Sequence, residues 1–222
     1  MGKEQDIHRL ISELGSADPT VQEQAIDTLV SIGDAAVEAL LEAMYDDDAA
    51  TSINAIETLG QIKDIRALEP LIAALQDDNS QVVITAINAL RRIGDPGAIQ
   101  PLIQFLSSDN MYLHFNATLA LGQIKHSDTI NSLLDLIDNE NPNIRHGCIV
   151  ALGRLGDRKA IGTIIKMLGD KEDKIRYSAA YALGDLAEVG DKSVIGALQA
   201  LAKDGNSDVS NSVRQALEKL DT

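Results

Sequence analysis

Histidine side chains are the groups in this sequence best suited to bind a metal ion or to transfer protons. The chain has four of them, His8, His114, His126 and His146, and no two are three or four residues apart. A metal-binding pair on one helix needs that spacing, so the sequence predicts no histidine metal centre. His114 and His146 fall on the same face of neighbouring predicted helices, one position out of register, which we interpret as a chance surface neighbourhood.

The single cysteine, Cys148, is the one side chain that could act as a thiol nucleophile. It takes a place in the repeat described below where the other repeats carry alanine, at Ala25, Ala55, Ala86, Ala117 and Ala179. This favours a small buried side chain over a reactive one. A lone cysteine also excludes a disulfide within the chain and a cysteine-based zinc site, and it favours a cytoplasmic location.

The acidic run Tyr45-Asp46-Asp47-Asp48 offers oxygen ligands for a divalent cation. It lacks the spacing of a calcium loop and lies at a predicted turn, where aspartate commonly caps a helix, so we interpret it as capping. Neither a glycine-rich phosphate loop nor a Ser-His-Asp arrangement is recognisable. The sequence therefore predicts no catalytic residue, no metal and no cofactor.

The charge of the chain limits the partners that it can bind. Its net charge is −15, and residues 1–48 alone hold 12 Asp and Glu against 2 Lys and Arg. An acidic surface repels phosphate backbones, so we expect no nucleic-acid partner. The N-terminal segment is charged and precedes no long apolar run, so we expect neither a signal peptide nor a membrane span.

A helical pattern of apolar residues recurs about every 31 residues and dominates the sequence. In residues 79–109 the first predicted helix places Val82, Ala86, Leu90 and Ile93 on one face. The equivalent sets are Val21, Ala25, Leu29, Ile32; Thr51, Ala55, Leu59, Ile62; Leu113, Ala117, Leu121, Ile124; Ile144, Cys148, Leu152, Leu155; Ile175, Ala179, Leu183, Leu186; and Val209, Val213, Leu217, Leu220. The last set follows after 34 residues, which predicts a loop insertion near residues 188–191.

Each first helix is followed by a turn and a second amphipathic stretch. Gly33, Gly94 and Gly156 are expected to end first helices in the left-handed conformation. Such short helix pairs bury their apolar faces only by stacking on one another. The sequence predicts one all-α solenoid over residues 1–222, with a lone helix at 4–15, helix pairs that begin near residues 18, 48, 79, 110, 141 and 172, and a final lone helix at 206–220.

The segments 67–75 and 151–157 resemble the short HEAT-like repeats of the phycobilisome lyase type, and the resemblance covers nearly the whole chain. It implies an α-α superhelix in which second helices line a concave face and first helices a convex face. It is weak for function, because the family includes lyase subunits as well as adaptors and scaffolds. HEAT-type deoxyhypusine hydroxylases bind iron through His-Glu pairs, whereas these histidines precede Arg9, Phe115, Ser127 and Gly147.

An arginine typical of the family's first helix appears here only at Arg145 and Arg176. Repeats 1 to 4 carry Gln22, Ser52, Val83 and His114 at that position. If the arginine bonds a turn aspartate, such a ladder exists only in the C-terminal half. We therefore expect the N-terminal half to be looser.

Two surfaces of the predicted solenoid could bind a partner. The second helices should present a concave groove that suits a basic protein or peptide segment, lined by Glu38, Glu42, Glu69, Gln100, Gln104, Asn131, Asp135 and Lys166. The first helices carry apolar residues on the convex side, unless neighbouring helices cover them: Ile53, Ile84, Phe115, Leu119, Tyr177 and Tyr181. Of the two, the groove is slightly favoured.

The functional prediction from the sequence is a non-catalytic protein-interaction scaffold or adaptor. The alternative is a phycobilin chromophore lyase or a subunit of one. The family resemblance allows this alternative, although no nucleophile or base is placed to support it.

Overall fold

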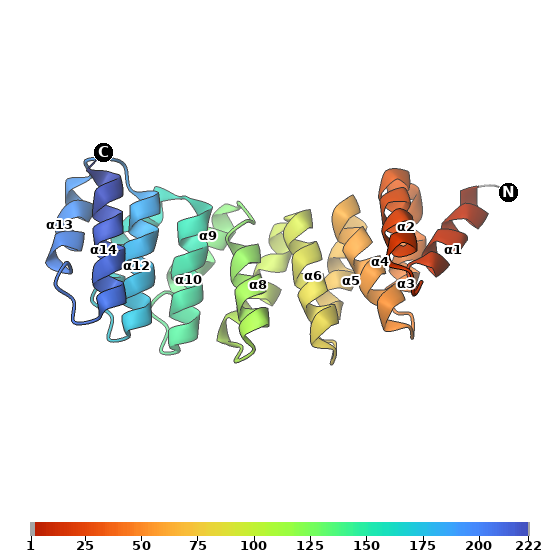
Figure 1. Cartoon of the computed structure of the whole chain (residues 1–222), viewed down its shortest axis with the longest axis horizontal. Coiled ribbons are helices and arrows are strands. Elements are labelled where there is room, and N and C mark those ends of the chain that lie inside the picture. The colour runs from red at the N-terminus through yellow and green to blue at the C-terminus, as the bar shows by residue number, and fades with distance from the viewer. Residues whose placement is uncertain (1–2, 222) are drawn as a thin grey trace. The chain divides into compact units, whose positions relative to one another are not determined.

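The computed structural model describes residues 3–221, and within that range the chain is all-α, with short 3₁₀ helices and no strand (Figure 1). The longer, first helices of the repeats are α2 (Pro19–Ile32), α4 (Ala49–Ile62), α6 (Ser80–Ile93), α8 (Met111–Leu121), α10 (Pro142–Leu155), α12 (Asp173–Leu186) and α14 (Ser207–Leu220). The second helices are α1 (Lys3–Glu13), α3 (Val37–Ala43), α5 (Leu68–Ala74), α7 (Ile99–Ile103), α9 (Ser127–Leu136), α11 (Ile161–Met167) and α13 (Lys192–Ala200). The 3₁₀ helices are η1 (Gly33–Ala36), η2 (Ile65–Ala67), η3 (Pro96–Ala98), η4 (Gln104–Ser107) and η5 (Arg158–Ala160).

Polar side chains start the first helices by capping free backbone N–H groups. The Asp48 carboxylate accepts a hydrogen bond from the Thr51 N–H at 2.8 Å and one from the Thr51 hydroxyl at 2.7 Å. The hydroxyl bond is the main reason why the pKa of Asp48 is lowered. This geometry confirms the capping interpretation of the acidic run at residues 46–48.

The ends of the first helices follow the glycine prediction in two of the three cases. Gly94 and Gly156 adopt the left-handed conformation, with φ of 74° and 75°. Gly33 has φ 66° but ψ −128°, because the chain passes directly into the 3₁₀ helix η1. Lys63 takes the left-handed position after α4, at φ 61°, without a glycine.

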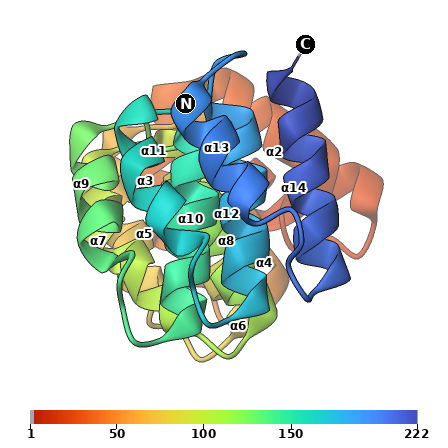
Figure 2. The ribbon, with the colours of Figure 1, turned by 90° about the vertical axis from the view of Figure 1, so that its left-hand side faces the viewer.

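The chain divides into two compact units, residues 1–102 and residues 103–222. In the first unit, α2 packs on α4 and α4 packs on α6, while α3 and α5 pack against the first helices that follow them. In the second unit, α8, α10, α12 and α14 pack in series, and Figure 2 shows α9, α11 and α13 to one side of them. The extension of one solenoid through both units stays a prediction.

The core of each unit comes from the repeating apolar positions. The alanine and leucine positions in the middle of each set are fully buried in α2, α4, α6, α8, α10 and α12, with cysteine in place of alanine in α10. The outer positions lie near the helix ends, where Val21, Ile32 and Ile144 are only half-buried. Residues 187–191 form the predicted insertion between α12 and α13, and the Gly190 N–H donates to the Leu220 carbonyl at 2.9 Å.

An arginine ladder exists in the second unit, as the sequence predicts. The Arg145 side chain is buried and donates from Nε and Nη2 to the Asp170 carboxylate at 2.8 and 2.9 Å. Arg176 bonds Asp204 in the same way, at 2.8 and 3.0 Å. At the equivalent position of α4, the Ser52 hydroxyl donates to the Met44 carbonyl at 2.8 Å. This side chain is shorter than arginine and forms no ion pair.

No helix in residues 3–221 is long and apolar enough to cross a bilayer.

Candidate interaction surface

The residues predicted to line a concave groove are all exposed. Glu38 lies in α3, Glu69 in α5 and Gln100 in α7, and Glu42 also faces solvent in the first unit. The second unit holds the remaining four, Gln104, Asn131, Asp135 and Lys166. The predicted set is therefore shared between two units, and a joint role for its members stays a prediction.

Arg66 sits within the acidic part of this set, which sequence reasoning missed. Its guanidinium pairs with Asp34, with Glu38 at 3.0 Å and with Asp64 at 2.8 Å. Its hydrogen bonds lower the pKa of Asp64 to about 2. Because Arg66, Asp34 and Glu38 are exposed, solvent screens their ion pairs, which add little stability.

The residues predicted to form a convex apolar ridge differ in exposure. Phe115, Tyr177 and Tyr181 are 59%, 42% and 50% exposed. Ile53, Ile84 and Leu119 are only half-buried rather than open to solvent, because adjacent first helices pack against their sides. The apolar exposure is thus concentrated in aromatic side chains of the second unit.

Two further exposed residues join Phe115 on α8. Met111 is 78% exposed and Tyr112 is 71% exposed, at the first two positions of the helix after the Asn110 cap. Sequence reasoning missed both, because it considered only the core face and the face opposite to it. Large apolar residues in a helical first turn, where polar residues are usual, are the signal that could have found them.

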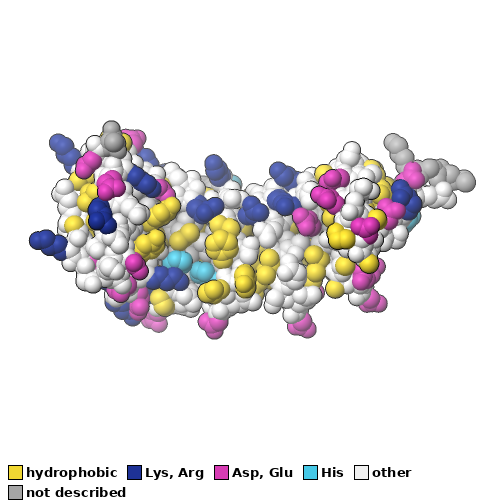
Figure 3. Space-filling model, viewed as in Figure 1, with side chains coloured by type: hydrophobic (Ala, Val, Ile, Leu, Met, Phe, Trp, Pro, Cys, Tyr) yellow, Lys and Arg dark blue, Asp and Glu magenta, His cyan; other side chains and the backbone are white. Residues whose placement is uncertain are grey.

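We call the surface formed by Met111, Tyr112, Phe115, His146, Lys174, Tyr177 and Tyr181 the aromatic face. Figure 3 shows it from the side of the first helices, with histidines between groups of hydrophobic side chains and basic side chains beside them. Large exposed apolar patches of this kind usually mark interaction sites.

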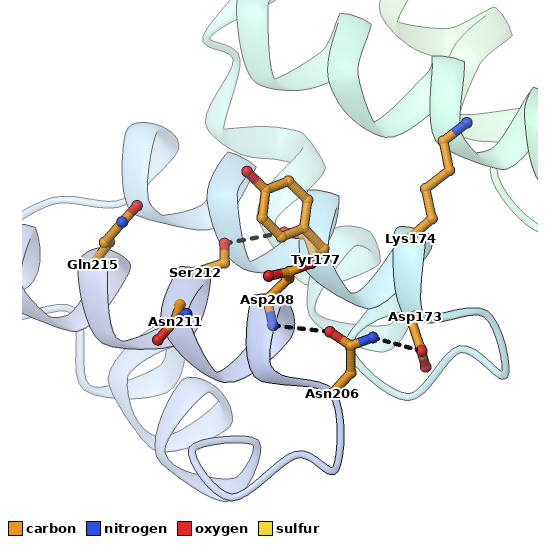
Figure 4. A pocket seen from close by; sticks show the side chains of 8 residues that line it. All are labelled: Asp173, Lys174, Tyr177, Asn206, Asp208, Asn211, Ser212 and Gln215. Atoms are coloured by element: carbon orange, nitrogen blue, oxygen red, sulfur yellow. Dashed lines mark hydrogen bonds between the residues drawn. The ribbon is translucent and has the colours of Figure 1, made fainter.

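Three hollows cross the aromatic face. Hollow A, of about 560 Å³, is lined by Met111, Tyr112, Phe115, Asn143, His146 and Lys174. Hollow B, of about 290 Å³, is lined by His146, Val150, Arg154, Tyr177, Tyr181 and Asp185. Hollow C, of about 560 Å³, lies between α12 and α14 and is lined by Asp173, Lys174, Tyr177, Asn206, Ser212 and Gln215 (Figure 4). Most of the aromatic side chains line A and B, whereas C has one aromatic residue, Tyr177, among polar residues.

His114 and His146, predicted to be surface neighbours, are half-buried and in direct contact. Their rings stack with centroids 5.7 Å apart, and His114 Nε2 lies 3.4 Å from His146 Nδ1. His114 Nδ1 lies 3.0 Å from the Leu106 carbonyl, which can only accept, so Nδ1 carries the proton. Nε2 of His114 then accepts from His146. Within residues 3–221 no group of three potential metal ligands forms around the pair.

The histidine pair should make the second unit less stable in mild acid. Burial, reinforced by the charges of Lys174 and His114, lowers the pKa of His146 from 6.5 to about 4. The unfolded chain takes up a proton near pH 6.5 and the folded chain does not, so stability is lost as the pH falls from 6.5 towards 4. Urea unfolding at about pH 7.5 and about pH 5 should show a loss of about 1–2 kcal/mol that His146→Gln removes. The exposed control variant His8→Gln should keep the full loss.

Cys148 is inaccessible in the folded chain. It is fully buried in α10, and burial raises the pKa of its thiol to about 12. Because the thiolate is the reactive form, we expect a thiol reagent such as dithiobisnitrobenzoate to react at least about 100-fold more slowly with the native chain than with the chain in urea. Equal rates in the two states would contradict this burial.

The comparisons with known proteins agree on the repeat type. The family model of HEAT repeats matches residues 7–91, 69–143 and 130–218. No curated protein matches the sequence. An archaeal HEAT-like repeats protein from Thermococcus onnurineus NA1 is similar at a TM-score of 0.64 and 16% identity, covering 97% of each chain.

Two further solved structures share the fold. The CpcE–CpcF complex of phycocyanin lyase from Nostoc sp. PCC7120 is similar at a TM-score of 0.51 and 20% identity, over 96% of this chain and 94% of that one. A chain from the structure of Kap95p with RanGDP is similar at a TM-score of 0.68 and 13% identity, over 99% of this chain and 36% of that one. At these identities the structures show the fold alone, and the matched repeats give the family. From residue 7 to residue 218, this chain belongs to the HEAT-repeat family.

Proposed function

We propose that this chain is a non-catalytic scaffold that binds a partner protein through the aromatic face of residues 103–222. The observation that carries the proposal is the exposure of Tyr112, Phe115, Tyr177 and Tyr181 around hollows A and B. Tyrosine supplies contact area with a polar end, and it is enriched among the residues that dominate binding energy. The repeat fold supports this function, because stacked repeats offer long rigid surfaces.

Truncation of the aromatic face tests the proposal. A partner purified with the wild-type chain, then reconstituted from pure components, should bind Phe115→Ala at least about 10-fold more weakly. The matched control is Tyr45→Ala, which removes an aromatic ring that is 66% exposed on the first unit. A partner that binds Phe115→Ala and the wild type equally would refute the aromatic face as the binding surface.

The acidic second-helix residues of the first unit are a second candidate surface, suited to a basic segment. Residues 1–102 hold 18 Asp and Glu against 6 Lys and Arg, a net charge of −12. Such a field steers and orients a basic partner, and salt weakens it. Charge reversal at Glu38 and Glu42 should lower affinity for a basic partner, and unchanged affinity would exclude this surface.

A chromophore lyase is the alternative function, and it is disfavoured by the state of the only thiol. Cys148 has no solvent exposure and a raised pKa, so it is unsuited to attack a bilin. Mixing the chain with free bilin and an acceptor apoprotein separates the two functions. New visible absorbance bound to the acceptor would overturn the scaffold proposal.

The cysteine content bears on where the proposed scaffold works. With one cysteine and no second thiol to form a disulfide, the proposed scaffold would work in the cytoplasm.

A further inference from the structure

We infer that the aromatic face binds an extended, acidic segment of a partner protein, with large apolar side chains in hollows A and B and a carboxylate at Lys174. This inference rests on the proposed function and specifies its partner. The surface consists of residues that belong to three successive hollows in the second unit.

The three hollows converge, so one continuous segment can occupy all of them. His146 lines hollows A and B, Tyr177 lines hollows B and C, and Lys174 lines hollows A and C. Each pair of hollows thus shares one side chain of α10 or α12. Because each two hollows share a lining side chain, a bound segment can pass from one hollow directly into the next.

The helix packing sets the spacing of the anchors along the segment. Packed helices lie about 8–10 Å apart, and hollows between successive first helices are separated by about that distance. An extended chain advances about 3.3 Å per residue, so neighbouring hollows take side chains about three residues apart. The segment would carry apolar anchors at positions i and i+3 for hollows A and B. A polar residue near i+6 would meet the amide and hydroxyl groups of hollow C.

Two basic side chains at the hollows lack acidic partners. Lys174 and Arg154 are exposed, and neither forms an ion pair with any carboxylate of the described residues. Lys174 borders the two larger hollows, and Arg154 borders hollow B. A partner carboxylate would complete the ion pair that each of them lacks, and a basic segment would be repelled.

Carboxylates also line the hollows, and two of them are already in ion pairs. Asp173 is paired with Arg176 at 2.6 Å, and Asp185 is paired with Lys219 at 2.6 Å. Asp109 lines hollow A and Asp208 lines hollow C, and neither is in an ion pair among the described residues. The second unit as a whole holds 16 Asp and Glu against 13 Lys and Arg, so an acidic segment meets far less repulsion here than at residues 1–102.

A random peptide library displayed on phage tests the inference without a known partner. The library is selected on the full-length chain and counter-selected on Phe115→Ala, so that only binders of the aromatic face are kept. We expect enriched peptides to carry two large apolar residues about three positions apart and at least one Asp or Glu. Synthetic copies are then measured by fluorescence anisotropy.

Charge variants identify the role of Lys174. Lys174→Glu should weaken the selected peptide about 10-fold, whereas Lys192→Glu, the same change at an exposed lysine of α13 in the same unit, should alter binding less than about twofold. A peptide with Lys in place of its acidic residue should regain affinity for Lys174→Glu. Both variants change exposed residues, and circular dichroism verifies their folding.

The outcomes separate the inference from the proposed function. Enriched peptides that are basic or uncharged would overturn the inference while leaving the aromatic face as a binding surface. No Phe115-dependent enrichment would also overturn it, and the reconstituted partner would then decide the proposed function independently. Self-association of the chain that Phe115→Ala abolishes would show that the occupant is a second copy, which contradicts an acidic partner segment.

Discussion

Replacing Arg145 with alanine should lower the free energy of unfolding of residues 103–222 by about 3–5 kcal/mol. The Arg145 side chain is only 6% exposed, and besides the Asp170 carboxylate it bonds the backbone carbonyls of Asn139 and Glu140 at 2.8 and 2.9 Å. Its removal leaves the buried Asp170 carboxylate with the Glu172 N–H as its remaining donor, and it takes the arginine donor away from two backbone carbonyls. Urea unfolding followed by circular dichroism measures the loss.

Asp170 shows why the effect should be large. Burial raises the pKa of Asp170, but the hydrogen bonds from Arg145 and from the Glu172 N–H outweigh burial and lower it overall. The stabilisation from this lowered pKa is present at neutral pH and is lost as the pH falls through the folded-state pKa. The Arg145→Ala variant should therefore lose less stability on acidification than the wild type.

Arg158→Ala is the matched control for Arg145. Arg158 also pairs with a carboxylate, that of Glu188, but its side chain is 50% exposed. Exposed ion pairs contribute about 0–1 kcal/mol, so this variant should unfold almost like the wild type. Equal losses of unfolding free energy in the two arginine variants would mean that the Arg145–Asp170 ion pair contributes no more than an exposed one.

Replacing Gly60 with alanine should destabilise the first unit by about 2–3 kcal/mol, although alanine is the better helix former. Gly60 lies in α4 against α6, and a Cβ atom there would stand 2.6 Å from the Ala89 Cα and 2.7 Å from its Cβ. The Ala89 Cα belongs to the backbone of α6, which cannot move aside as the end of a flexible side chain can. The two helices would have to separate, which opens packing along their length.

Gly162→Ala supplies the contrasting control. Gly162 is also helical, in α11, but a Cβ there would meet nothing within 4 Å. The substitution should stabilise the chain by about 0.5–1 kcal/mol through helix propensity alone. Similar effects of the two glycine substitutions, measured by urea unfolding, would refute close contact between α4 and α6.

The repeat pattern predicted the elements and the core well, because burial follows helical periodicity. Leu29, Leu59 and Leu90 occupy one place in the pattern and all are fully buried. The prediction was weaker where a side chain depends on its neighbours in space. Ile53 and Phe115 occupy the same place in the pattern, yet Ile53 is half-buried while Phe115 is 59% exposed.

The candidate site was only partly predictable for the same reason. Phe115, Tyr177 and Tyr181 stood out in the sequence as apolar residues on an outward face. The sequence did not show that these residues lie beside Lys174. It also did not single out the flanking residues Met111 and Tyr112. Residues 111 to 177 come together only because α8, α10 and α12 pack side by side.

The sequence by itself determined the helical class, the repeat length, the capping residues, the arginine ladder of the second half and the burial of Cys148. These features depend on residues a few positions apart or on one repeating set of positions. Tertiary structure alone decided the contact of His114 with His146, the ionic cluster around Arg66 and the hollows of the aromatic face. Each of these joins side chains from different helices, whose approach depends on the local distance and rotation between packed helices rather than on any spacing within the chain.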